Sequence, residues 1–303
     1  MDNKKHIVCL IFILCGLLMA GCDSRSGPNA TASSERSLFH GVVTYGFYSD
    51  HHGTFHFSKT AVIKADGSLW SIVYIRGETG ITRKIMNDVA HIDIAETNLL
   101  IHHKDGSLWV LSFRGDWSNP PVKKLDNVVS FAANVNLIMA VTTDGSLWAW
   151  RSSGAFYGVE RAGVGDGTTE DRNEPTHIMD NVVHISAGVN HSLAVQADGS
   201  LWAWGSNQGG QLGTGTTDTE LEPVKIMSDV KRVTAGWHNS FAIKTDGSLW
   251  AWGNNGFGQI GTSLCSPLDN KTGENALTPV KVFEDAAFVS MGGYRNGAVD
   301  KPC

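Results

Sequence analysis

Three stretches of the chain hold residue types that can bind ions. Histidines gather at His51, His52 and His56, in SDHHGTFH, and imidazole nitrogens this close in sequence suit zinc or copper. The acidic run DGTTED at 166–171 offers the oxygen ligands that calcium takes. The run GSNQGGQLGTG at 205–215 has the glycine content of loops that cradle phosphates with backbone N–H groups. A metal ion and a phosphate are therefore the first ligands to weigh.

Each stretch also has a purely structural interpretation. A polar turn between two strands accounts equally well for the histidines, which stay a weak metal candidate. The acidic run lacks the ligand spacing of a dedicated calcium loop. The glycine-rich run is not followed by Lys-Ser or Lys-Thr and does not open a helix, and a phosphate loop needs both. We therefore assign no metal site and no cofactor.

One pentapeptide, Asp-Gly-Ser-Leu-Trp, occurs five times, opening at Asp66, Asp105, Asp144, Asp198 and Asp246. Asp-Gly between alternating apolar segments predicts a tight hairpin with positive φ at both central residues. Five identical hairpins indicate one repeated supersecondary unit, so the aspartates are assigned to turns and not to catalysis.

Paired tryptophans follow the best copies of the turn, at Trp202 and Trp204 and at Trp250 and Trp252. A spacing of two places each pair on one face of its strand. We expect them to pack between neighbouring sheets rather than to stack on sugars, since buried aromatic rings contribute strongly to a core.

The two fullest copies are Ser186–Val230 and Thr234–Val282. After the tryptophans they continue with Gly-x-Asn-x-x-Gly-Gln-Leu/Ile-Gly, a polar loop and Pro-Val-Lys-Ile/Val. This pattern resembles the regulator of chromosome condensation repeat, which forms one blade of a β-propeller. The likeness is strong over 132–283 and weak over 38–131. It implies an all-β propeller of about six four-stranded blades, or a truncated seven, with degenerate N-terminal blades.

A sixth copy begins at Ser290 but stops at Cys303, before an Asp-Gly turn of its own. Two alternatives follow for the last blade. Residues 38–57 supply the strands that complete it, as propellers commonly close by mixing strands from both ends. Alternatively, the chain is truncated.

The N-terminus reads as an export signal. Lys4 and Lys5 precede an apolar run over 7–20, and Leu18-Met19-Ala20-Gly21-Cys22 resembles the bacterial lipobox. That resemblance implies cleavage before Cys22, a diacylglyceryl group on its sulfur, and a membrane anchor with fatty-acyl chains such as palmitate. An ordinary secretory signal is the alternative. We predict a signal peptide at 1–21, a flexible tether at 22–37 and the propeller at 38–303.

These features predict a location in the bacterial cell envelope, facing outward from the cytoplasm. Asp23, directly after the lipidated cysteine, favours the inner membrane. An oxidising compartment permits a disulfide between Cys265 and Cys303, with two unpaired thiols as the alternative. The formal net charge is −6 and no basic run occurs, so we expect no nucleic-acid partner.

Function is expected in the loops, where the sequence stops repeating. We predict a non-enzymatic binding module that presents its loops to a protein or cell-wall partner in the envelope, because aromatic groups on a rigid rim are good interface anchors. The candidate contact residues are Phe156, Tyr157, Trp237, Asn254, Asn255 and Phe257. One alternative is an inhibitor of an envelope enzyme. Another is a hydrolase or carbohydrate-active enzyme, whose mark would be two carboxylates about 5–10 Å apart in the central funnel.

Overall fold

The fold is all-β. A computed structural model describes residues 39–46, 58–74, 81–95, 98–112, 119–134, 137–151, 163–256, 258–261 and 274–289. The regular structure in these ranges consists of strands β1–β20, which form five four-stranded antiparallel sheets, and no helix occurs in them. In that part of the chain there is accordingly no helix that could cross a membrane. The predicted fold class is confirmed.

The strands fall into two compact units, divided after Val89, and each unit is described by itself. The first holds β1 (Phe39–Gly46), β2 (Ser58–Lys64), β3 (Leu69–Tyr74) and β4 (Ile81–Met86). The sheets of the second are β5 (Val89–Ala95), β6 (Asn98–His103), β7 (Leu108–Ser112) and β8 (Val122–Leu125); β9 (Val128–Ala133), β10 (Leu137–Thr142), β11 (Leu147–Arg151) and β12 (Thr176–Met179); β13 (Val182–Ala187), β14 (His191–Gln196), β15 (Leu201–Gly205) and β16 (Glu220–Met227); and β17 (Val230–Ala235), β18 (Asn239–Lys244), β19 (Leu249–Gly253) and β20 (Ala276–Phe283).

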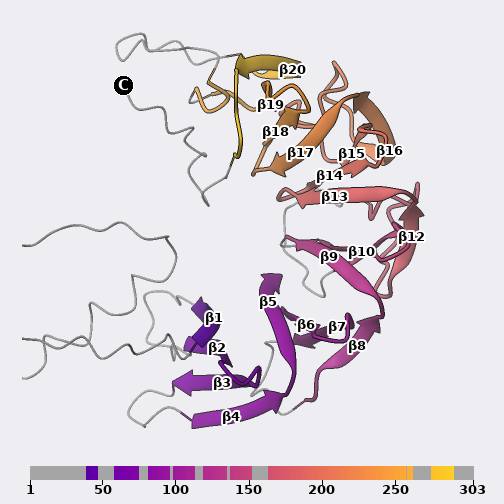
Figure 1. Ribbon diagram of the computed structural model, residues 1–303. Helices are drawn as coiled ribbons and strands as arrows, with labels where there is room; N and C mark the ends of the chain where they lie inside the picture. The colour runs from indigo at the N-terminus through magenta and orange to yellow at the C-terminus, as the bar shows by residue number, and fades with distance from the viewer. Residues whose placement is uncertain are drawn as a thin grey trace, which may run out of the picture. The chain divides into compact units, whose positions relative to one another are not determined.

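Every sheet is a meander in which each strand pairs with the next strand along the chain. Figure 1 shows the four sheets of the second unit side by side in an arc, with β5, β9, β13 and β17 on its inner side. In the first unit β1 pairs with β2 along its whole length, so residues 39–46 belong to the first sheet. The expectation that segment 38–57 completes the last blade is therefore not met over these eight residues.

The Asp-Gly-Ser-Leu-Trp turns differ from the expected two-residue type. In the first copy Lys64 N donates to Ser68 O, and Gly67 N donates to Lys64 O, both at 2.9 Å. Only the glycine has positive φ, 81° at Gly67, while Asp66 does not. This is a three-residue hairpin loop with a left-handed glycine after a type I turn, so the prediction of two positive φ values was wrong.

The aspartate side chain explains why the motif is so uniform. Asp246 Oδ1 accepts hydrogen bonds from Ser248 N at 2.8 Å and from Ser248 Oγ at 2.6 Å, and Trp250 Nε1 donates to that same Oγ at 3.0 Å. These bonds hold the pKa of Asp246 below its usual range. The carboxylate accepts hydrogen bonds within its own turn and stabilises it, which confirms the structural assignment of the motif.

Each turn also holds the start of the next sheet. The glycine carbonyl accepts the first amide of the following inner strand, as in Val182 N to Gly145 O and Val230 N to Gly199 O, both at 2.9 Å. Just before these strands, Asn181 and Asp229 take left-handed backbone conformations, with φ of 60° and 63°. The repeated turn therefore links sheet to sheet as well as strand to strand.

Three tryptophans fill the spaces between sheets. Trp150, Trp204 and Trp252 are at most 1% exposed, and each packs in a cluster with residues of the preceding sheet. The first tryptophan of each pair is half-buried over its own turn. The expected core position is confirmed for Trp204 and Trp252, whereas Trp202 and Trp250 are only half-buried.

Candidate functional site

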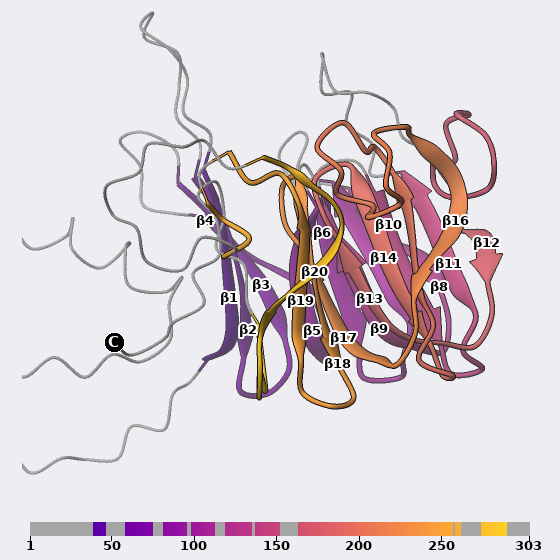
Figure 2. The ribbon, with the colours of Figure 1, turned by 90° about the horizontal axis from the view of Figure 1, so that it is seen from above.

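The meander gives each sheet two unlike ends. At one end, called here the turn edge, lie the Asp-Gly turns and the short links to the next sheet. At the opposite end, the loop edge, lie 163–175, 188–190, 206–219, 236–238 and the described parts of 254–275. Figure 2 views the strands from the side, with short hairpins at one end and longer loops at the other. The longer connections between the described strands therefore lie at the loop edge.

Trp237 is the aromatic candidate that the structure places on the loop edge, with 36% of its surface exposed. Its ring lies against His238, with ring centroids 6.2 Å apart. Neighbouring loops fix the backbone on both sides, because Val189 N donates to Gly236 O at 3.3 Å and Asn254 N donates to His238 O at 2.7 Å. The indole is therefore presented on a braced loop.

The two asparagines beside it serve the loop itself. Asn255 is 3% exposed and its Oδ1 accepts from Ile260 N at 3.2 Å, so it is corrected from a candidate contact residue to a structural one. Asn254 Oδ1 accepts from Gln259 Nε2 at 2.7 Å and from Gly256 N at 3.1 Å. Asn254 stays partly exposed beside Trp237 but its side-chain oxygen is already used.

Other candidates lie outside the described residues: Phe156, Tyr157, Phe257, Cys22, Cys265, Cys303 and the histidines at 51, 52 and 56.

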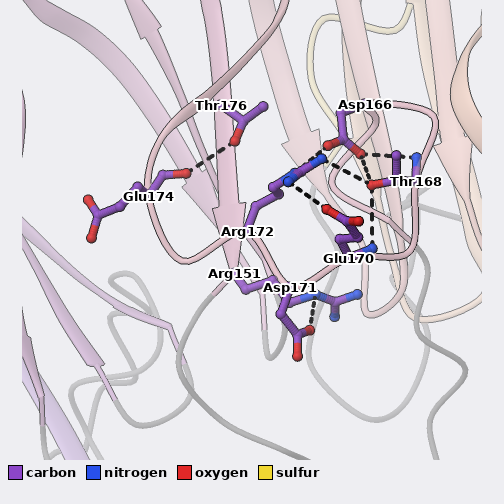
Figure 3. Close-up of polar contacts among 8 residues, drawn as sticks. All are labelled: Arg151, Asp166, Thr168, Glu170, Asp171, Arg172, Glu174 and Thr176. Atoms are coloured by element: carbon purple, nitrogen blue, oxygen red, sulfur yellow. Dashed lines mark hydrogen bonds and ion pairs between the residues drawn. The ribbon is translucent and has the colours of Figure 1, made fainter.

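The acidic loop 166–171 forms an ion-pair network, shown in Figure 3. Asp166 Oδ2 pairs with Arg172 Nε at 2.6 Å, while its Oδ1 accepts from Thr168 N and Thr168 Oγ1. Arg172 also meets Glu170 Oε2 at 2.8 Å, and Asp171 pairs with Arg151 at 3.1 Å. Burial raises the pKa of Asp166, but the bonds from Arg172 and Thr168 together outweigh burial and hold that pKa below its usual range. Arg172 supplies the positive charge beside these carboxylates, and no group of three or more metal-ligating side chains is found among the described residues.

The glycine-rich run packs over the next sheet. Asn207 Oδ1 accepts from Leu212 N at 2.9 Å, and Leu212 is fully buried in the cluster around Trp252. A Cβ on Gly213 would lie 2.9 Å from the Trp252 ring. In the preceding sheet a Cβ on Gly165 would likewise lie 2.7 Å from the Trp204 ring. These glycines are needed because a Cβ would clash with the tryptophan ring packed against them. They do not surround an open phosphate site.

A buried polar chain connects the last two sheets. His191, 1% exposed, contacts Ser240 Oγ through Nε2 at 2.8 Å, and Ser240 Oγ donates to Gln211 O at 2.7 Å. Because the serine proton is used for Gln211, Nε2 of His191 carries the hydrogen, and its Nδ1 has no partner among the described residues. Burial, and secondarily His238, lowers the pKa of His191 to about 3. His191 is thus a neutral structural residue and not a base.

From His191 we predict that the folding stability of the chain decreases in acid. Its folded pKa of about 3 lies below the unfolded value of 6.5, so the unfolded state binds the extra proton and stability falls as pH drops through that window. We expect His191→Gln to reduce the loss of unfolding free energy between pH 7 and pH 5 by about 2 kcal/mol. Urea denaturation at both pH values measures it. Equal losses in wild type and variant would contradict the assignment.

Sequence reasoning missed a set of residues on the inner strands. His184 in β13 and Arg232 in β17 are each the third residue of their strand, and both line a cavity of about 290 Å³. The strands vary at this position while the flanking valines repeat, so no motif marked it. The two residues could have been related only through the register of the repeats, and that register is visible only once the strands are aligned.

Comparison with known proteins agrees with this geometry. Two models, both described as the regulator of chromosome condensation (RCC1) repeat, match this chain, one at residues 198–243 and 246–294 and the other at 182–211 and 230–259. The X-linked retinitis pigmentosa GTPase regulator homolog of Caenorhabditis elegans is 34% identical over 89 residues, which cover 28% of this chain and 6% of that protein.

Solved structures are similar over more of the chain. Yeast RCC1 (Prp20), solved with Kap60 bound, has a TM-score of 0.56 at 18% identity, covering 74% of this chain and 61% of that one. Human WBSCR16 gives 0.54 at 19% identity, covering 74% and 65%. The chain thus spans less than two thirds of the length of these proteins. It carries RCC1 repeats at 182–294 and has the β-propeller fold of RCC1-like structures.

Proposed function

We propose that this chain is a non-enzymatic protein-binding module of the bacterial envelope, with the loop edge as its docking surface. The observation that carries the proposal is Trp237, an exposed indole on a loop tied to its neighbours at Gly236 and His238. A fixed aromatic side chain loses little entropy on binding, and tryptophan is enriched at the energetic centres of interfaces. Yeast RCC1, which has a similar fold, was solved with another protein, Kap60, bound to it.

The described inner strands of the second unit do not carry the paired carboxylates that would mark the hydrolase alternative. Of β5, β9, β13 and β17, only β5 carries an acidic residue, Asp93. The turn aspartates lie at the turn edge, where their carboxylates accept hydrogen bonds from serines or a threonine. These placements favour binding over hydrolysis as the activity to test first.

The proposal is tested by capture of partners from native membranes with the full tagged chain. We expect Trp237→Ala to lower recovery of a specific partner at least about tenfold, as loss of an anchor residue does. Val183→Ala is the matched control, because Val183 is 59% exposed but lies at the start of β13, next to the turn edge. Equal recovery with both variants, or greater loss with Val183→Ala, would refute the loop edge as the surface.

We further propose that Cys22 carries the lipid that holds the module at the membrane. The proposal is supported by the apolar run over 7–20 and by the lipobox-like Leu18–Cys22. Several acyl chains at about 0.8 kcal/mol per buried CH₂ would make attachment effectively permanent. Asp23 supports the inner membrane as its location.

For Cys22→Ala we expect loss of labelling by radioactive palmitate and movement of the mature chain from the membrane fraction to the soluble fraction. Cys265→Ala serves as the control and should keep both the label and the membrane location. Retained label in Cys22→Ala would contradict the anchor.

A further inference from the structure

The cavity between the inner strands combines one unpaired cation with polar and apolar walls. The Arg232 side chain is exposed, and its guanidinium makes no ion pair or hydrogen bond with any residue that the structure describes. His184, half-buried beside it, has an Nδ1 atom that is buried and without a partner in the described ranges. The guanidinium is thus an exposed, unpaired donor group at the cavity, with the half-buried imidazole in the same lining.

Equivalent register explains why these side chains meet. Val182 and Val230 each donate to a turn glycine, and His184 and Arg232 follow two residues later. Ala286 N donates to Gly247 O in the same way, at 2.8 Å, so Phe288 occupies the matching place on the next segment. The same position in three consecutive repeats therefore supplies an imidazole, a guanidinium and a phenyl ring to one cavity.

The walls of the cavity are firmly held. Thr234 Oγ1 donates to Val289 O at 3.2 Å, and Ala235 N donates to Ser186 Oγ at 2.9 Å, so both neighbours of β17 are bonded to it. Apolar surface comes from Val233, Ile243, Val289 and Phe288, the last being 70% exposed. An exposed aromatic ring beside an unpaired guanidinium suits a ligand with one charged and one apolar end.

We propose that this cavity binds an organic carboxylate bearing a small apolar group. The guanidinium of Arg232 matches a carboxylate with two parallel N–H donors. His184 supplies a polar wall beside the guanidinium, and burial, together with the charge of Arg232, lowers the pKa of its imidazole. The volume of about 290 Å³ lies at the lower end for small-molecule sites, which suits a group the size of a phenyl ring.

Two probes test the site by calorimetry on the full chain in detergent: phenylacetate for a free small acid, and the peptide acetyl-Ala-Ala-Phe for a chain end. Either one binding supports the proposal, and the tighter of the two identifies the source of the carboxylate. Phenylacetamide, the neutral analogue, should bind at least about tenfold more weakly than phenylacetate. No heat from either acid, or equal affinity for the amide, overturns the proposal.

Variants distinguish binding at this cavity from an effect of net charge and from binding at the loop edge. Arg232→Gln should weaken binding of the better probe at least about tenfold, whereas Lys231→Gln, an adjacent exposed cation outside the cavity, should leave it unchanged. Trp237→Ala should also bind the probe normally, so failure of one proposal leaves the other standing. Equal weakening by Lys231→Gln and Arg232→Gln would reduce the effect to net charge and overturn the site.

Discussion

Replacing Trp252 with alanine is expected to lower the free energy of unfolding by about 3–5 kcal/mol. The ring is fully buried and packs in a cluster that includes Leu193 and Leu201 of the preceding sheet. Its Nε1 donates to Gln211 O at 2.8 Å, so the indole also ties the glycine-rich loop to the next sheet. Alanine would leave a cavity between two sheets and remove the donor to that carbonyl. Urea denaturation followed by circular dichroism gives the difference.

Trp250, two residues earlier on β19, is the matched control. It is half-buried, and its Nε1 donates to Ser248 within its own turn at 3.0 Å. Since Trp250→Ala removes partly solvated surface and one local hydrogen bond, we expect a loss of about 1–2 kcal/mol. Equal losses for the two variants would mean that the sheets are not joined through Trp252.

Gly253→Ala is expected to destabilise the chain by about 3 kcal/mol or more, from two separate causes. The backbone φ is 102°, which a residue with a Cβ rarely adopts. In addition, the new Cβ would lie 2.5 Å from His238 O and 2.7 Å from Asn239 Cα, which are backbone atoms that cannot rotate away. The strain would fall on the loop that carries Trp237, so partner capture should decline with stability. Thermal and urea unfolding measure the first effect.

Gly215→Ala separates the two causes. Gly215 also has positive φ, 89°, but the nearest atom to a new Cβ is Thr278 Cγ2 at 3.7 Å, an ordinary contact. Conformational strain alone should cost about 1–2 kcal/mol there. A Gly253→Ala variant no less stable than Gly215→Ala would show that the loop shifts freely, contrary to a braced loop edge.

The sequence predicted the fold class well because its strongest signals are local and repeated. Asp246, Gly247 and Ser248 close their turn through contacts within a few residues, so identical pentapeptides gave identical hairpins. The turn type was misjudged because Asp-Gly serves both two- and three-residue loops. Arg151 occupies the position at which the two later copies have Gly205 and Gly253. In the structure it lies at the end of β11, its amide donates to Arg172 O, and it is absent from the residues with positive φ.

The candidate site was harder to predict because its residues meet only through packing between sheets. Asn255 and Trp237 look alike as loop residues, yet closure of the loop buries the first and leaves the second exposed. The left-handed Asn127 and Asn181 precede inner strands in short, variable links that carried too little pattern to be noticed. His184 and Arg232 are far apart in sequence and share a cavity only because successive inner strands hold the same register.

The most direct test of the docking surface is site-specific photo-crosslinking in native membranes. A photoreactive phenylalanine analogue placed at position 237 should crosslink to one discrete envelope protein. The same group at position 104, exposed on the turn edge, should give none above background. Crosslinks that are absent at 237, or that form equally at 104, would contradict the proposal that the loop edge of this propeller binds a protein partner.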